Sequence, residues 1–128
     1  MVYLNGERNG KGKEYNNDGK LIFEVEYLNG EINGKGKKYL YGDLIFEGEY
    51  LDGEKNGNGK EYEMKFEENR LIFEGEYLNG KRNGKGKEYY YNDKVEFEGE
   101  YLNGQRNGKG KEYDLEDNLI FEEWKWIW

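Results

Sequence analysis

The sequence predicts an all-β protein: a single-layer, twisted, antiparallel meander of about ten strands, built as a repeat solenoid of stacked β-hairpins. Two observations support this fold. A unit of the form Tyr-Leu-Asn-Gly-x-x-Asn-Gly-x-Gly-Lys recurs five times, with Asp52 as its one departure at a fixed position. Between copies, apolar residues alternate with Glu at the period of a strand, and Asn-Gly, the strongest short hairpin signal, follows. The copies begin at Tyr3, Tyr27, Tyr50, Tyr77 and Tyr101.

The repeats predict one domain over residues 1–128, because each hairpin buries its apolar side only against its neighbours. The expected repeats are residues 3–26, 27–49, 50–76, 77–100 and 101–123. Residues 124–128 form a Trp-rich C-terminal cap or association strand in this prediction.

The turn at Asn29-Gly30 predicts the register of the first complete hairpin. A two-residue type I′ turn there places Tyr27 opposite Ile32. Continuing this register predicts three more pairs: Val25 with Gly34, Glu24 with Lys35, and Phe23 with Gly36. An aromatic ring then covers a glycine. In later hairpins the same logic places Phe46, Phe73 and Phe97 over Gly59, Gly86 and Gly110.

The return connections are turns as well. A two-residue Asp18-Gly19 loop is expected to bring Lys13 opposite Glu24. These connections vary in length, so insertions gather on one edge of the sheet. The insertion at Met64–Asn69 is therefore either a surface loop or an extended hairpin on that edge.

Composition restricts the chemistry. Only 34% of residues are hydrophobic, but 17% are aromatic, so the expected core consists of rings. The sequence contains no Ala, Cys, His, Pro, Ser or Thr. It therefore lacks the commonest nucleophiles, the commonest general base and the usual zinc ligands. We expect no catalytic site, cofactor or metal.

Charge and hydropathy restrict the partners and the location. The net charge of −8 disfavours nucleic acid and makes membrane binding unlikely. No apolar run has transmembrane length and the Met1 end has no signal-peptide pattern, so a cytoplasmic protein is expected. The Gly-Lys-Gly-Lys tracts match no P-loop and indicate a solvated, charge-paired face.

The segment Phe73-Glu-Gly-Glu-Tyr-Leu-Asn-Gly-Lys-Arg-Asn-Gly-Lys-Gly86 resembles a MORN repeat, and this resemblance covers essentially the whole chain. It implies an elongated twisted sheet with one hairpin per repeat and a groove lined by aromatic residues. It also implies a non-enzymatic role in scaffolding, partner binding or self-association, and in some members phospholipid contact. Val25 departs from the leading glycine of the pattern. A position often occupied by His holds Asn33, Asn56, Asn83 and Asn107.

Two surfaces are candidate binding sites. The first is an aromatic-glycine groove for an amphipathic helix or extended peptide. Its residues are Phe46, Tyr50, Phe73, Tyr77, Phe97 and Tyr101. The alternative is that these rings only pack together to stabilise the sheet. The second is an association edge at Trp124, Trp126 and Trp128, whose indoles share one face of a strand. It supports a homodimer or a membrane-interface stripe, or else it caps a monomer.

The predicted function is a non-enzymatic scaffold that binds a protein or peptide and self-associates. One alternative is a peripheral phospholipid-binding module. Another is a designed or consensus array without a biological ligand, which the near-identical copies and missing residue types also fit.

Overall fold

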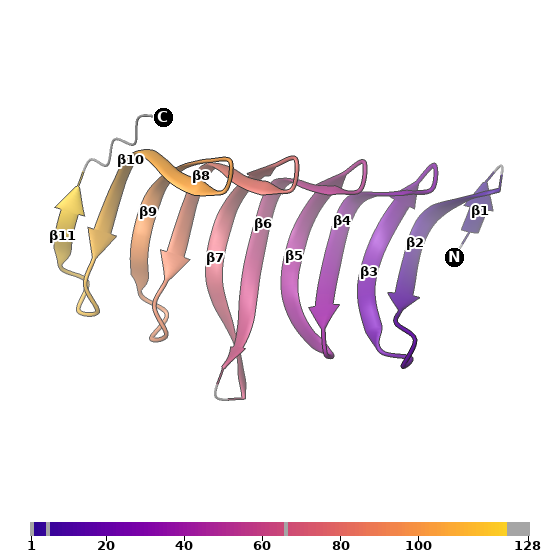
Figure 1. The fold of residues 1–128 in the computed structure, drawn as a ribbon, viewed down its shortest axis with the longest axis horizontal. Coiled ribbons are helices and arrows are strands. Elements are labelled where there is room, and N and C mark those ends of the chain that lie inside the picture. The colour runs from indigo at the N-terminus through magenta and orange to yellow at the C-terminus, as the bar shows by residue number, and fades with distance from the viewer. Residues whose placement is uncertain (1, 5, 66, 123–128) are drawn as a thin grey trace.

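The computed structural model describes residues 2–4, 6–65 and 67–122. In these residues eleven strands form one antiparallel sheet, and each strand is hydrogen-bonded to the strands before and after it in sequence (Figure 1). The strands are β1 (Val2–Leu4), β2 (Glu7–Tyr15), β3 (Leu21–Leu28), β4 (Glu31–Leu40), β5 (Asp43–Leu51), β6 (Glu54–Lys65), β7 (Glu68–Leu78), β8 (Lys81–Tyr89), β9 (Val95–Leu102), β10 (Gln105–Tyr113) and β11 (Leu119–Glu122). The predicted all-β meander is confirmed. Within the described ranges no helix is long and apolar enough to cross a membrane.

The Asn-Gly turns form the hairpin tips, as predicted. Asn79 has a φ of 51° and Gly80 a φ of 84°, the two positive values that a type I′ turn requires. The backbone N–H of Gly80 also donates a 2.9 Å hydrogen bond to the carbonyl of Lys55 in the preceding hairpin. Equivalent bonds run from Gly30 to Arg8, from Gly53 to Ile32 and from Gly104 to Arg82. Each tip therefore links its hairpin to the one before it.

The return connection after β2 is longer than predicted. The side-chain oxygen of Asn16 accepts hydrogen bonds of 2.9 Å and 3.0 Å from the N–H groups of Asp18 and Lys20. The loop therefore spans residues 16–20, and the predicted two-residue Asp18-Gly19 loop is wrong. Lys13 still pairs with Glu24, because a bulge next to the loop takes up the extra residues.

The insertion between β6 and β7 continues the ladder. Met64 pairs with Asn69, so this segment is the extended hairpin and not a surface loop. It reaches beyond the other return connections, which lie on the same edge of the sheet (Figure 1).

The register predicted for the hairpin closed by Asn29-Gly30 is correct only next to the turn. Tyr27 pairs with Ile32, as predicted. The predicted pairs of Val25 with Gly34, Glu24 with Lys35 and Phe23 with Gly36 are wrong, because Val25 pairs with Gly36, Glu24 with Lys37 and Phe23 with Lys38. A bulge causes the shift: residues 33–35 stand opposite Glu26 alone. Gly34 has a φ of 94° there, a conformation that glycine adopts without steric cost.

The core is a row of six aromatic rings on one face of the sheet. Phe73 packs edge-on against Tyr77 and Tyr101, with centroid distances of 5.8 Å and 5.2 Å. The row continues through Phe46, Tyr50 and Phe97 with the same T-shaped geometry. Each such pair contributes about 0.5–1.5 kcal/mol beyond its buried area. The rings therefore join successive repeats into one core.

Glycines let these rings lie directly on the backbone. A Cβ on Gly59 would stand 2.6 Å from Cζ of Phe46, so no larger residue fits beneath that ring. The same holds for Gly86 under Phe73 and Gly110 under Phe97, so the predicted ring-over-glycine contacts are confirmed although the register differs.

The first repeat is the exception. Val25 covers Gly36, with Cγ1 at 2.8 Å from where a Cβ would stand. The Val25 side chain occupies the space that the Phe ring takes in later copies, so Phe23 remains only half-buried.

Candidate binding groove

A groove of about 1720 Å³ crosses the sheet on the face opposite the rings. The central residues of β2 to β10 line it, together with Glu122 of β11. Even-numbered strands line it with Lys-Gly-Lys, except that Asn58 replaces one lysine in β6. Odd-numbered strands up to β9 line it with one or both glutamates of this segment and with the residue between them, which is glycine or, in β3, Val25. Because side chains alternate between the faces of a strand, the lysines and glutamates face the groove while ring residues face the other way. We call this surface the central groove.

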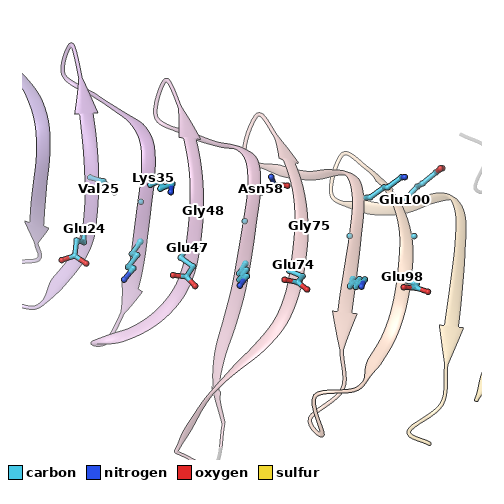
Figure 2. Close-up of a pocket in the computed structure, with 18 of the residues that line it drawn as sticks. Glu24, Val25, Lys35, Glu47, Gly48, Asn58, Glu74, Gly75, Glu98 and Glu100 are labelled. Carbon is cyan, nitrogen blue, oxygen red and sulfur yellow. The ribbon is translucent and has the colours of Figure 1, made fainter. Parts of the chain in front are cut away.

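One line of charges runs the length of the central groove with strictly alternating sign. Each member is the direct cross-strand neighbour of the next, and we call this line the charge row. In order, it contains Lys13, Glu24, Lys37, Glu47, Lys60, Glu74, Lys87, Glu98, Lys111 and Glu122. Figure 2 shows the four glutamates of β3, β5, β7 and β9 in this line.

Tyrosine hydroxyls fix the carboxylates of the charge row. Tyr89 donates a 2.5 Å hydrogen bond to Glu74, and Tyr113 donates a 2.6 Å bond to Glu98. Tyr62 contacts Glu47 in the same way. The bond to Glu98, with a smaller contribution from burial, raises the pKa of Tyr113 to about 12. The acids are therefore held in place and not free to swing into solvent.

A second line of side chains follows the bulges. Here the carboxylates turn toward the backbone: Oε2 of Glu76 accepts a 2.6 Å hydrogen bond from the N–H of Lys85. It also lies 2.5 Å from where a Cβ on Gly84 would stand, and the φ of 98° at Gly84 is a conformation that favours glycine at that bulge. The same arrangement recurs for Glu26 over Gly34, Glu49 over Gly57 and Glu100 over Gly108. These glutamates cap the bulged backbone.

Asn58 interrupts the second line in the middle of the sheet. It stands directly opposite Glu76, at a position where the other repeats carry lysine. Those lysines are Lys11, Lys35, Lys85 and Lys109. Figure 2 shows Lys35, Asn58 and Glu100 in this line, parallel to the charge row. The central groove therefore lacks one positive charge near its midpoint.

The ring face carries a separate polar network. Arg82 donates hydrogen bonds of 2.8 Å and 3.2 Å to Glu61, which also accepts one from the hydroxyl of Tyr77. Burial alone raises the pKa of Glu61, but the bonds from Arg82 and Tyr77 outweigh it and hold that pKa below its ordinary value. The guanidinium of Arg82 also lies 4.0 Å from the centroid of Phe73.

The repeats on either side also place a cation over the phenylalanine ring. Arg106 lies 4.1 Å from the centroid of Phe97 and bonds to Glu88 at 2.7 Å, while Lys55 lies 4.2 Å from the centroid of Phe46. A layer of cations therefore shields the rings from water.

The structure places the predicted site residues as follows. Phe46, Tyr50, Phe73, Tyr77, Phe97 and Tyr101 are at most 6% exposed and form the core, on the face opposite the central groove. Their use as contact residues for a partner stays a prediction. Trp124, Trp126 and Trp128 lie outside the described residues.

The lysines and glutamates of the charge row were not predicted as a site. Their signal in the sequence is the fixed phase of Lys-Gly-Lys and Glu-Gly-Glu, broken only by Val25 and Asn58, which marks one face of successive strands. Among the described residues, no three acidic, His or Cys side chains are grouped to hold a metal ion. The groove presents charges of both signs in alternation.

Comparison with known families agrees with this architecture. Five segments match the MORN repeat, at residues 3–20, 26–41, 46–62, 73–95 and 97–114. No curated protein matches the chain. The matched segments coincide with the five hairpins of the array and cover most of the sequence, so the chain belongs to the MORN repeat family, a scaffold family whose members are generally non-catalytic.

Proposed function

We propose that this protein is a non-enzymatic scaffold that binds a protein or peptide segment lengthwise in the central groove. One observation carries the proposal: a continuous channel of about 1720 Å³ crosses ten strands and presents fixed, alternating charges along its whole length. A channel of this length suits an extended or helical segment more than a small molecule, which fills a compact pocket.

The charge pattern favours a polypeptide over an anionic surface or nucleic acid. Neighbouring strands are about 4.8 Å apart, so like charges in the charge row recur roughly every 10 Å. At such spacing the opposite charges cancel each other beyond a Debye length of about 8 Å, and no long-range field of one sign remains. A polypeptide with charges of both signs can pair with such a row, whereas a uniformly anionic vesicle or nucleic acid meets repulsion at every glutamate.

Asn58 provides one distinct position along the central groove at which a bound partner can align. A strictly periodic row accepts a periodic partner in several registers of similar energy. Replacing one lysine by a neutral amide beside Glu76 makes one position unlike the rest. A partner cation placed there does not meet the lysine that the other repeats carry at this position, so we expect this position to fix the register.

We expect no turnover of a substrate. The available titratable groups of the central groove are lysines and glutamates in direct cross-strand pairs, open to solvent. Such open pairs do not form the enclosed site, closed to water, in which a catalytic acid or base acts.

Site-specific photocrosslinking tests the proposal. A photoreactive residue replaces Asn58 in the central groove or, as the matched control, Asn17 in an exposed return loop. After exposure to cell extract, we expect crosslinked polypeptides at position 58 and not at position 17. A peptide from the crosslinked region is then titrated by calorimetry against the unmodified chain and a Lys37→Glu, Lys87→Glu variant. We expect the variant to bind at least about tenfold more weakly. Equal crosslinking at both positions, or equal affinity of the variant, would sink the proposal.

Binding to liposomes tests the alternative phospholipid-binding function. Binding to anionic vesicles that fades as salt rises would favour the phospholipid-binding function instead.

A further inference from the structure

The ring face repeats one three-part contact at two boundaries between hairpins. A tyrosine hydroxyl and an arginine both bond to a glutamate on the strand before the tyrosine. Between the fourth and fifth repeats these are Tyr101, Arg106 and Glu88, with bonds of 2.6 Å and 2.7 Å to the carboxylate. The preceding boundary has Tyr77, Arg82 and Glu61. At the first boundary Arg8 of the preceding hairpin pairs with Glu14 and donates a 3.3 Å hydrogen bond to the hydroxyl of Tyr27, and Ile32 stands at the position equivalent to Arg82.

The boundary between the second and third repeats lacks the carboxylate. Lys38 occupies the glutamate position: it pairs with Phe23 and Phe46, just as Glu61 pairs with Phe46 and Phe73. Lys55 occupies the arginine position, because it pairs with Tyr50 as Arg82 pairs with Tyr77. Two cations therefore stand where the two later boundaries have an ion pair.

The tyrosine of this boundary has lost its acceptor. Tyr50 is 6% exposed, and its buried hydroxyl has no hydrogen-bond partner among the described residues. The equivalent hydroxyls of Tyr77 and Tyr101 donate to Glu61 and Glu88. A buried hydroxyl without a partner carries a desolvation cost that its equivalents avoid.

The two lysines also lack a dedicated counter-charge. Burial, together with the neighbouring charge of Lys38, lowers the pKa of Lys55, although Glu61 partly opposes the shift. Glu61 is already bonded to Arg82 and Tyr77. The ammonium groups instead face rings, Lys38 at 5.9 Å from the centroid of Phe23 and Lys55 at 4.2 Å from that of Phe46.

We propose that the cluster of Lys38, Tyr50 and Lys55 binds a carboxylate supplied from outside the chain. The carboxylate takes the place that Glu61 and Glu88 fill at later boundaries, lies between the two ammonium groups and accepts the hydrogen bond of the Tyr50 hydroxyl. The site is on the face opposite the central groove and does not depend on binding there.

Thermal unfolding in acetate and in chloride at equal ionic strength tests this site. We expect acetate to raise the unfolding midpoint of the unmodified protein above its value in chloride. The matched variant Lys38→Glu supplies the carboxylate from the chain itself, so its midpoint should be the same in both salts. If the two proteins respond equally to acetate, the site does not exist.

A second variant and two further probes identify the ligand. Tyr50→Phe removes the donor without changing the volume, and we expect acetate to bind about tenfold more weakly to it. An unchanged response in Tyr50→Phe would contradict the proposal. A capped Gly-Glu-Gly peptide that stabilises more than acetate would place the carboxylate on a partner polypeptide, and an equal effect would indicate a free carboxylate. Stabilisation by phosphate alone would refute the carboxylate specificity.

Discussion

The guanidinium of Arg82 lies 4.0 Å from the centroid of the Phe73 ring, and that ring has no exposed surface. Among the residues that the structure describes, no second sheet or helix covers the apolar face of this single-layer sheet. Here the cover comes from the array itself, with the glycine backbone under the ring, tyrosines at its edges and a cation on its outer side. The arginine shields the core and also pairs with Glu61.

Replacing Arg82 therefore affects both core and network. We expect Arg82→Ala to lower the free energy of unfolding by about 2–4 kcal/mol, because it uncovers Phe73 and leaves Glu61 without its cation. Urea denaturation followed by circular dichroism measures the loss. Lys81→Ala, at the adjacent exposed tip position, is the control and should change stability by less than about 0.5 kcal/mol. Similar losses in the two variants would show that the cation does not cover the core.

The two core tyrosines Tyr77 and Tyr50 predict opposite results for the same substitution. Tyr77→Phe removes a hydrogen bond to Glu61 and should cost about 1.5–3 kcal/mol. Tyr50→Phe removes a hydroxyl that has no partner among the described residues, so it should be neutral or stabilising by up to about 1 kcal/mol. Both are measured by urea denaturation in chloride buffer. A Tyr50→Phe variant as unstable as Tyr77→Phe would mean that the Tyr50 hydroxyl is bonded.

The glycines under the rings differ in what a methyl group would meet. A Cβ on Gly59 approaches only side chains, Cζ of Phe46 among them, whereas one on Gly75 stands 2.6 Å from the backbone of Lys85 and Gly86. Alanine at either site should cost about 3 kcal/mol. Because a side chain can be shortened, Phe46→Leu should recover part of the cost of Gly59→Ala.

A contact with the backbone, as at Gly75, cannot be relieved by shortening a side chain. Phe73→Leu should recover little of the cost of Gly75→Ala, although it removes the same ring from the same kind of contact. Double-mutant cycles measure the two coupling energies. Equal couplings would contradict the distinction.

Acid should destabilise the protein through Glu61. Bonds from Arg82 and Tyr77 hold its folded-state pKa below the unfolded value, against the effect of burial. Its contribution is therefore fully present above the ordinary carboxyl pKa of about 4.3, and is lost as the pH falls through the lower folded-state value. We expect Glu61→Gln to flatten the acid limb of a plot of unfolding free energy against pH. Glu54→Gln, at an exposed tip, is the control and should leave the plot unchanged.

The Trp-rich tail remains a prediction, because Trp124, Trp126 and Trp128 lie outside the described residues. Light scattering on the intact chain, and on a variant with all three changed to Lys, tests self-association. We expect a dimer for the intact chain and a monomer for the variant. A monomeric intact chain at high micromolar concentration would make the tail only a cap.

The strand order and hairpin tips followed from local signals in the sequence. Asn29-Gly30 specifies its turn by backbone conformation alone, so the pair of Tyr27 and Ile32 was predictable. The register beyond it was not, because alternation of residue types does not reveal that residues 33–35 share one partner. Only the positive φ of Gly34 marks the bulge.

The site was harder to predict than the fold. Phe46 and its equivalents were correctly placed over glycines, but a ring over a glycine fits either a groove or a core. The choice depends on what covers the outer side of the ring. That cover comes from residues such as Lys55, and the alternation of residue types does not show that its ammonium group lies over the ring of Phe46.

The hydrogen bonds at the hairpin tips all have the same direction, since the N–H of Gly80 bonds to Lys55 and that of Gly104 to Arg82. The donor always belongs to the later hairpin and the acceptor to the earlier one. A ribosome makes the chain in that order, at about 5–20 residues per second. When a new hairpin forms, the carbonyl group that accepts its hydrogen bond is therefore already in place. Until then, water can hydrate that carbonyl group. The array can thus assemble repeat by repeat during translation.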